Sequence, residues 1–449
     1  MEHKIIDSSL KSILSITVPM VLSVLSTNLM FLIDRAMLAG YSMDSMNAAA
    51  MAGNFTVIFT MMLIGISNSA EIFVGQYNGS KQYDKLAAPV WQMIYMSLAA
   101  SVILIPIAYF SDYLHTLPDY YLKEGVAYQK TLMYFGALPS LRVAFCAFFI
   151  GRGKTKIITF SVIAGIIVNA ILDYLLIYGI KNVFPGTGCQ GAAIATVIAE
   201  FVQIVILAAI FFNNKNRTIC QTLKNNKFDY KLFCSCIKIG LPLSFGNFIS
   251  MLAWYVVQTA ISYSSKDIAT IYNIGMNVYI FFLFVGEGIN KAAAAICSNM
   301  IGRRDLQSIE KTRQVFIAIS LFFGYIIAIP LIGFPEWILS ILDMLPDNIS
   351  MLYSDIKTVF YWVTVTIVLE TLLFSTWGIL IAGGDTRYAV IVYQITLWGL
   401  VALPTAILYY MGALNSVPVV YLFMVAWLVM TQFFLYKRYK SLKWYNKLV

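Results

Sequence analysis

Long apolar segments separated by short polar loops dominate the chain. A helix needs about 20 predominantly apolar residues to cross roughly 30 Å of hydrocarbon. Segments of that kind start close to Ile13, Ala48, Val90, Thr131, Ile157, Gly191, Ile239, Ile271, Val315, Val359, Val390 and Val417. The pattern predicts an all-α integral membrane protein with twelve transmembrane helices. The first segment lacks a small-residue cleavage site, so we expect a permanent span and not a cleaved signal.

The twelve predicted spans divide into two similar halves. Three pairs of identical residues stand 223 positions apart (242 minus 19 for the first pair): Pro19 with Pro242, Gly65 with Gly288, and Gly79 with Gly302. Further along, the segment 153–155 (GKT) corresponds to 384–386 (GDT) at an offset of 231. Six crossings return the chain to its starting side, so the two halves should have the same topology.

We therefore expect two six-helix lobes related by a pseudo-twofold axis along the membrane normal. Residues 1–212 form the predicted amino-terminal lobe and 239–449 the carboxy-terminal lobe. The polar, basic stretch 213–238 is the predicted cytoplasmic linker. A cleft between the lobes is the natural path for a substrate.

Composition and charge agree with a membrane protein. The chain is 60% hydrophobic and only 12% charged, whereas about a quarter of the residues of soluble proteins are charged. The net charge of +9 does not indicate nucleic-acid binding, because the cations lie in loops between apolar spans. The basic loops, with 81–85, 152–156, 215–238 and the tail 437–447 among them, alternate with poorly charged ones. The positive-inside rule then predicts that both termini are cytoplasmic, and we expect a multi-pass protein of the plasma (inner) membrane.

Motifs of soluble enzymes are incomplete. The segment 186–191 (GTGCQG) has dinucleotide-type glycine spacing but no preceding strand, and a tight re-entrant turn is expected there. The two histidines, His3 and His115, fall in a tail and an outer loop, which leaves no metal cluster and no catalytic pair. We expect no enzymatic activity, no cofactor and, with cysteines mostly in spans or cytoplasmic loops, no disulfide.

Four polar residues inside predicted spans converge on one depth. An ionisable side chain at the bilayer centre costs about 2.5 to 3.5 kcal/mol, so it faces the protein interior or a water-filled cavity. Asn169 and Asp173 are four residues apart and lie on one helix face. With a rise of about 1.5 Å per residue, Asp34, Asn169, Asp173 and Thr196 all fall in the outer half of the membrane. These four residues come from three helices of one lobe, so we predict that they form a common functional site there.

Other charged residues in the spans have competing interpretations. Glu287 and Lys291 are four apart on one helix, which favours a structural pair. Arg142 and Glu200 either pair across two helices or serve the substrate, and the sequence leaves both open. Trp254 belongs to an aromatic set that is more typical of packing than of a pocket.

Several segments resemble the multidrug and toxic compound extrusion (MATE) transporters. Pro19 followed by LMFLIDRAMLAG (29–40) resembles the first helix of that family. VNAILDYLLIYG (168–179) with GAAIATVIAE (191–200) is similar to the family's fifth and sixth helices. GQYNGSKQYDK (75–85) and SNMIGRRD (298–305) stand where the family has glycine-and-charge loops. The similarity covers essentially the whole chain.

The resemblance implies an antiporter that expels amphipathic, often cationic, organic compounds by alternating access in exchange for Na⁺ or H⁺. Its partners would be a small-molecule substrate, the coupling cation and the lipid bilayer, and we expect a monomer. By motif, Asp34, Asn169, Asp173 and Thr196 correspond to the cation site. Their oxygen atoms suit an alkali cation or a shared proton. Pro19, which lacks a backbone donor, is the expected point of helix bending.

A second acidic residue inside the spans, Glu370, matches the pattern of the family less well. Glu370 resembles a carboxylate of some branches of the family, but those branches also carry a glutamate early in helix seven, and residues 243–254 contain no acid. We therefore assign Glu370, together with Glu200, a substrate-facing or auxiliary role.

Two alternatives to an antiporter stay open for the whole protein. One is a lipid-linked oligosaccharide flippase of the same superfamily, which should have a more basic cleft, and the other is a channel.

Overall fold

The computed structural model describes residues 6–113, 122–180, 183–341 and 349–445. His3 and His115 lie outside this part of the chain. Within it, 12 helical segments are long and apolar enough to cross a membrane. The prediction of an all-α membrane protein with twelve spans is confirmed.

Six spans belong to the first half of the chain. Their helices are α1 (Leu10–Tyr41), α2 (Met43–Ser67) with α3 (Ser69–Gly79), α4 (Ala88–Tyr109), α5 (Leu122–Tyr134) with α6 (Leu138–Ile150), α7 (Thr155–Tyr178) and α8 (Cys189–Phe211). Short 3-10 turns flank α4, at Tyr83–Lys85 and Phe110–Tyr113. Two of the spans are interrupted, the second at Asn68 and the fourth just before Pro139, which occupies the first turn of α6. Proline fits there because the first helical N–H groups have no partner in the helix.

The second half repeats this plan after the short helix α9 (Asn214–Ile219). Its elements are α10 (Tyr230–Ser262), α11 (Lys266–Arg303), α12 (Leu306–Gly333), α13 (Pro335–Ile341), α14 (Ile349–Ala382), α15 (Thr386–Leu397), a π-helical turn (Trp398–Ala402), α16 (Leu403–Tyr410) and α17 (Val417–Lys440). Helix α10 begins well before Ile239, because the Asp229 side chain caps it by accepting from the Leu232 N–H at 3.1 Å.

Residues 186–188 form the turn that precedes α8, in the region where the sequence predicts a tight re-entrant turn. Just before this turn the chain forms a small antiparallel hairpin, in which β1 (Gly179–Ile180) pairs with β2 (Phe184–Pro185). Gly179 and Gly188 have positive φ angles of 78° and 51°, which only glycine adopts without strain. The glycines therefore shape the turn that leads from α7 into α8.

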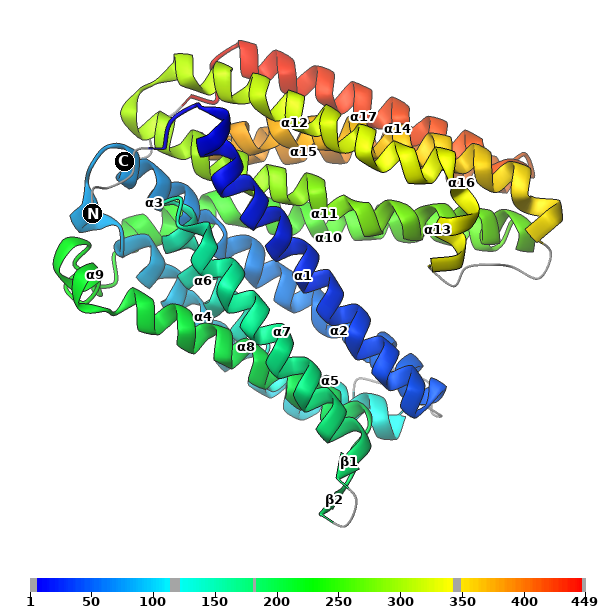
Figure 1. Cartoon of the computed structure of the whole chain (residues 1–449), viewed down its shortest axis with the longest axis horizontal. Coiled ribbons are helices and arrows are strands. Elements are labelled where there is room, and N and C mark those ends of the chain that lie inside the picture. The colour runs from blue at the N-terminus through cyan, green and yellow to red at the C-terminus, as the bar shows by residue number, and fades with distance from the viewer. Residues whose placement is uncertain (1–5, 114–121, 181–182, 342–348, 446–449) are drawn as a thin grey trace.

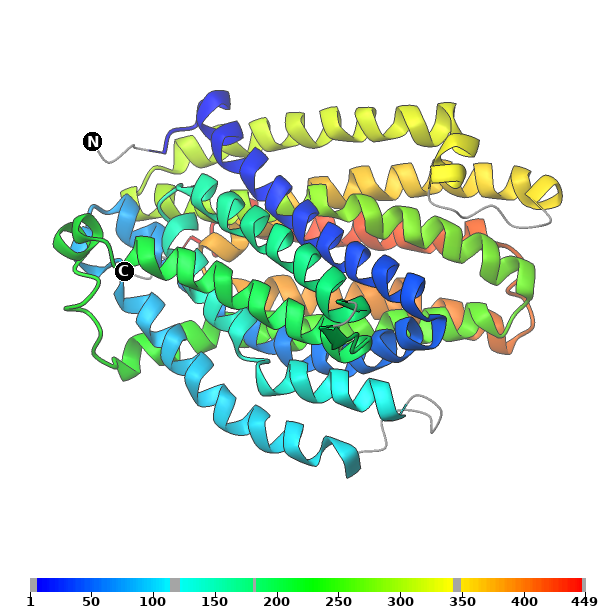
Figure 2. The ribbon, with the colours of Figure 1, turned by 60° about the horizontal axis from the view of Figure 1, so that its bottom comes forward.

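The two halves meet at one end of the molecule and diverge toward the other. We call the end that holds α9, the start of α1 and the end of α17 the terminal end, and the opposite one, with β1, β2 and α13, the hairpin end (Figure 1). Figure 2 shows the same helices from a second direction, with α1 crossing between the halves. The main contacts between halves are those of α1 and α3 with α11, and of α2 with α10.

Glycines that the internal repeat identified lie where the halves touch. A Cβ atom on Gly65 of α2 would overlap Ser244 of α10, and one on Gly288 of α11 would overlap Val21 of α1. Ser244 follows Val21 by the same 223 positions that separate the glycines. The two contacts are thus reciprocal, and each needs the absent side chain of glycine so that the helices can approach.

Candidate ion site and central cavity

A polar stripe on α7 faces the interior of the first half. Buried residues recur at every fourth position, at Gly165, Asn169, Asp173 and Ile177, and so lie on one helix face. Gly165 lies so close to Gln203 of α8 that a Cβ atom would overlap that side chain. This close packing of α7 against α8 brings the polar stripe next to the first turns of α8.

The structure brings all four predicted residues together. Asp34 on α1 is buried, with 6% of its surface exposed, and Asn169 and Asp173 on α7 are fully buried. The Thr196 hydroxyl on α8 donates to Oδ2 of Asp34 at 3.2 Å. The side chain of Asp34 also neighbours those of Asp173 and Asn169. Arg35 is exposed, so the aspartate points away from it into the protein.

The oxygen atoms of this cluster are largely unpartnered. Oδ1 of Asp34, Oδ1 of Asn169 and both carboxylate oxygens of Asp173 are buried and have no hydrogen-bond partner among the described residues. A buried polar group without a partner is costly, and two neighbouring carboxylates repel each other when both are ionised. A hard cation or a shared proton would relieve both penalties. The described residues contain no group of three His, Cys, Asp or Glu side chains able to hold a metal ion.

Sequence reasoning missed one neighbour of the site. Tyr128 on α5 is partly buried and lies near enough to Asp34 and Asp173 to interact with their charges. It precedes Thr131, where the fourth apolar segment begins, so the hydrophobic pattern placed it in a loop. Helix α5 begins at Leu122, before the apolar segment, and this early start brings the Tyr128 phenol to the site.

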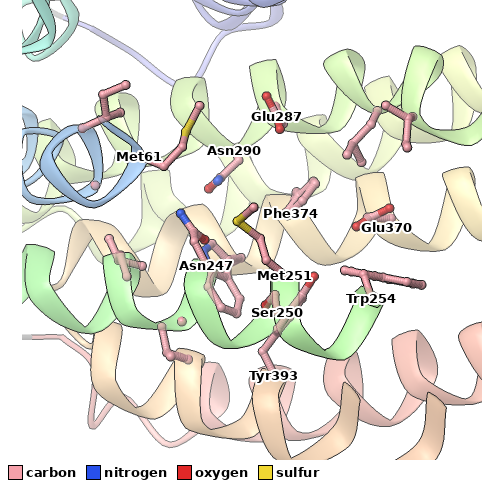
Figure 3. A pocket seen from close by; sticks show the side chains of 18 of the residues that line it. Met61, Asn247, Ser250, Met251, Trp254, Glu287, Asn290, Glu370, Phe374 and Tyr393 are labelled. Atoms are coloured by element: carbon pink, nitrogen blue, oxygen red, sulfur yellow. The ribbon is translucent and has the colours of Figure 1, made fainter. Parts of the chain in front are cut away.

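A cavity of about 880 Å³ lies between the halves. Its walls come from α2 and α3 of the first half and from α10, α11, α14 and α15 of the second, and Figure 3 shows side chains of these helices around it. Glu370 on α14 lines the cavity and is 3% exposed, and its Oε2 atom accepts a hydrogen bond from the Tyr279 hydroxyl of α11. The second-half acid thus belongs to the cavity and not to the Asp34 cluster.

The expected pairing of Glu287 with Lys291 is wrong. Both side chains line the cavity, yet the ion pairs within 4 Å among the described residues do not include them. The Lys291 ammonium instead interacts at longer range with two carboxylates, Glu287 on its own helix and Glu71 on α3 of the other half. The lining residues therefore combine three carboxylates with one ammonium group.

Aromatic rings form one wall of the cavity. Trp254, expected to serve packing, lines the cavity and also packs edge-on against Trp427 with ring centroids 5.8 Å apart. Tyr393 continues this wall at 5.1 Å from Trp427 and 5.3 Å from Trp377. Such rings offer apolar contact and attract cations over their faces.

Glu200 has a structural partner. The Arg142 Nε atom of α6 lies 2.7 Å from Oε2 of Glu200 on α8, and both side chains are mostly buried. Of the two alternatives that the sequence left open for Glu200, the structure shows the pair across these two helices. Glu200 is not among the lining residues of the cavity, and its ion pair ties α6 to α8 one helical turn along α8 from Thr196.

Pro19 lies inside α1, and its carbonyl is the point of attachment to α7. The Thr159 hydroxyl of α7 donates to the Pro19 carbonyl at 3.0 Å, and the Ser23 hydroxyl of α1 donates to the same oxygen at 2.7 Å. Proline removes one backbone hydrogen bond from the helix interior. Contacts from α7 thus support the weakest turn of α1.

Twelve apolar spans around an internal cavity that is lined by aromatic and charged side chains, with buried carboxylates in the spans, are typical of a membrane transporter. The model of the MatE family matches two segments of the chain, 19–175 and 242–408. The chain therefore belongs to the MatE family, whose members are transporters and not enzymes. The two matches start at Pro19 and Pro242, the pair that marks the internal repeat.

Named relatives agree with this assignment. The chain is 22% identical over 332 residues to the probable multidrug resistance protein NorM of Thermotoga maritima, covering 73% of this chain and 70% of the relative. It is 22% identical over 446 residues to the uncharacterized transporter YisQ of Bacillus subtilis, covering 97% and 95%. The multidrug resistance protein MdtK of Yersinia pseudotuberculosis is 22% identical over 351 residues, 76% of each chain.

Solved structures share the fold across nearly the whole chain. An outward-facing multidrug resistance MATE family transporter superposes with a TM-score of 0.83 at 16% identity, covering 97% of each chain. A MOP superfamily transporter from Pyrococcus furiosus, whose reversed pocket polarity suggests a different function for that protein, gives 0.85 at 14% identity over 97% of each chain. One fold therefore holds pockets of different polarity, and the cargo must be argued from the residues of the site.

Proposed function

We propose that this transporter exports amphipathic organic cations across the plasma membrane in exchange for Na⁺ or H⁺. The observation that carries the proposal is the cluster of Asp34, Asn169, Asp173 and Thr196, whose buried oxygen atoms are mostly unpartnered. Carboxylate, amide and hydroxyl oxygens are ligands that hard cations prefer. One carboxylate holding a proton would satisfy the same cluster.

The cavity supports an organic cation as cargo. Three carboxylates, Glu71, Glu287 and Glu370, outnumber the single ammonium of Lys291 among its lining residues. Aromatic and methionine side chains such as Trp254 and Met251 supply adaptable apolar surface beside these charges. A lipid-linked oligosaccharide carries negative phosphate groups and would favour a basic cavity, so the acidic lining argues against the flippase alternative.

Alternating access would couple the ion site to the cavity through α1. This helix carries Asp34 at the ion site and touches both α7 and α11, so it contacts both halves. A cation that binds Asp34 and Asp173 draws α1 toward α7, and the helix adjusts at Pro19, where a backbone bond is missing. An ion drives such a change only to the extent that it binds one state more tightly than the other.

Both termini are placed in the cytoplasm in this proposal, because the most basic loops lie at the terminal end. The cavity then opens to the exterior when the hairpin end is spread. The coupling ion enters from the outside and the cargo leaves to the same side. A monomer is sufficient for this cycle, since each chain carries its own ion site and cavity.

Transport in proteoliposomes tests the proposal. Accumulation of a fluorescent organic cation is measured with a Na⁺ gradient and a pH gradient imposed separately. We expect one gradient to drive transport, and Asp173→Asn to lower the rate at least tenfold. Asp44→Asn is the matched control, because Asp44 is exposed at the hairpin end of α2 and should leave the rate unchanged.

Two results would contradict the proposal. Gradient-driven transport at the wild-type rate in Asp173→Asn would remove the ion site from the mechanism. Electrical conductance without accumulation against a gradient would identify a channel instead of an antiporter.

A further inference from the structure

Two buried amide side chains cross between the halves at the terminal end. Nε2 of Gln76 on α3 donates to the carbonyl of Ala382 at the end of α14, at 3.0 Å. Nδ2 of Asn299 on α11 donates to the carbonyl of Gly151 at the end of α6, at 2.7 Å. Each bond runs from one half to the other, and both donor side chains are 99% or more buried, with exposures of 0% and 1%.

The two hydrogen bonds are copies of each other under the internal repeat. Asn299 follows Gln76 by 223 positions, and Ala382 follows Gly151 by 231 positions. These are the two offsets that relate the halves along the rest of the chain. The bonds therefore form a reciprocal contact of the kind that a twofold axis produces, in which each half supplies one donor and one acceptor.

The glycines of the repeat make this contact possible. A Cβ atom on Gly79 would overlap the Asn299 carbonyl, and a Cβ atom on Gly302 would overlap the Gln76 carbonyl. The backbones of α3 and α11 thus touch directly, again reciprocally. Asn78 adds one more bond across the same contact, since its Nδ2 atom donates to Oδ1 of Asn299 at 2.6 Å.

The acceptors are suited to a contact that opens and closes. The last carbonyl groups of a helix have no partner within the helix, and Ala382 and Gly151 stand at the C-terminal ends of α14 and α6. When the halves separate, water can take over both the freed carbonyls and the freed amides. Each bond therefore raises the ratio of the closed to the open population about fivefold to tenfold. A preference of this size still allows the contact to open.

We propose that Gln76 and Asn299 form a paired amide latch that holds the terminal end of the central cavity closed and sets how often that end opens. This inference rests on the alternating access of the proposed function. The latch is made when the hairpin end is spread, and both of its bonds must break before the cavity can open at the terminal end. Because the bonds are equivalent under the repeat, loss of either should have a similar effect.

Distances between spin labels at the terminal end test the latch. Lys156 at the start of α7 and Gln307 at the start of α12 are exposed, one in each half, and would carry the labels as cysteines. Cys234, the exposed one among the native cysteines, is replaced by serine. We expect Gln76→Leu to raise the population of a longer distance about fivefold to tenfold without any ligand. Asn299→Leu should raise it at least as much, because it also removes the bond from Asn78, and the double variant should raise it further.

Gln82→Leu is the matched control. Gln82 lies near the same contact, but its amide donates to Ser80 within its own half, so the distances should stay those of the parent. Gly79→Ala is a second route to the same state, because its methyl group would displace the Asn299 carbonyl while both amide donors remain. It keeps the test valid if a leucine variant fails to fold.

Unchanged distances in folded Gln76→Leu, Asn299→Leu and Gly79→Ala would overturn the latch. A shift in only one of the two leucine variants would contradict the reciprocal arrangement. The outcome is separable from that of the transport assay. If the wild type transports no organic cation but the latch variants still populate the longer distance, the proposed function fails and the latch stands.

Discussion

The Thr159 hydroxyl of α7 donates a 3.0 Å hydrogen bond to the Pro19 carbonyl of α1. This bond joins the helix that carries Asp173 to the turn of α1 that proline weakens. Thr159→Val keeps the shape of the side chain and removes the donor. Since such a bond contributes about 1 kcal/mol, we expect the transport rate to fall about fivefold while the affinity for the cargo stays unchanged.

The transport rate and the cargo affinity are measured separately, by initial rates in proteoliposomes and by equilibrium binding in detergent. Thr358→Val is the control, because the exposed Thr358 hydroxyl donates to the Ser354 carbonyl of its own helix and, among the described residues, makes no other hydrogen bond. Equal effects of the two variants on the rate would show that the Pro19 contact has no part in the cycle.

The ion pair of Arg142 with Glu200 predicts a stability effect. Glu200→Gln leaves the mostly buried guanidinium without a counter-charge, and breaking such a pair costs about 3 kcal/mol. Thermal unfolding in detergent should shift to a clearly lower temperature. Replacing both residues by methionine should restore most of the loss, because no unpaired charge then remains.

A pair with a more exposed acid provides the comparison. Glu310 lies 2.8 Å from Arg313, and the Glu310 side chain is 34% exposed whereas that of Arg313 is 13% exposed. Glu310→Gln should cost less than Glu200→Gln, because water reaches the Glu310 carboxylate. If Glu200→Gln costs no more than Glu310→Gln, the Arg142 pair is not the structural tie inferred here.

Much of the candidate ion site could be predicted from the sequence. Helical rise and the cost of charge in hydrocarbon are general rules, so they place Asp34, Asn169, Asp173 and Thr196 at one depth without a structure. Tyr128 could not be found in this way. It lies in a polar stretch before the apolar part of its span, and only the early start of α5 brings it near the carboxylates.

Contacts between the halves were the least predictable part of the fold. The spacing of Glu287 and Lys291 indicates a pair on one helix, but that rule takes no account of the opposite half. In the structure both face the cavity, and the charge of Glu71 on α3 competes for Lys291. The repeat revealed which residues are equivalent, whereas the register in which α3 meets α11 depends on tertiary packing.

The Asp305 side chain at the terminal end should make the stability of the folded protein depend on pH. Its side chain caps α12 by accepting from the Ser308 N–H at 3.0 Å, and hydrogen bonding by Ser308 holds the pKa of Asp305 below its usual range. A lowered pKa means that the folded state is stabilised above the unfolded pKa and loses this contribution as the pH falls through the lowered value. Asp305→Ala should cost about 1 kcal/mol at pH 7 and progressively less in acid.

Ser265→Ala separates the charge from the cap. The Ser265 hydroxyl caps α11 by accepting from the Ile268 N–H at 3.2 Å, and it does not titrate in this range. Its cost in thermal unfolding should therefore be the same at pH 7 and in acid. A cost of Asp305→Ala that is equally independent of pH would contradict the role of its charge.

Removal of the positive charge of Lys291 should change the affinity of the cavity for its cargo. Its ammonium group lies among carboxylates of the cavity and repels an incoming organic cation, while it offsets part of their charge. Lys291→Met keeps the length of the side chain and removes the charge. A unit charge several ångströms away at an effective dielectric constant near 20 corresponds to about 1 to 2 kcal/mol, so the affinity for a monovalent organic cation should rise roughly fivefold to thirtyfold.

Equilibrium binding of a fluorescent cation and of an uncharged analogue of similar shape measures this effect. The affinity for the analogue should hardly change, since it does not sense the ammonium charge. Lys266→Met is the control, because Lys266 is exposed at the hairpin end of α11. If Lys291→Met weakens cation binding instead, Lys291 holds the carboxylates in place for the cargo and does not compete with it.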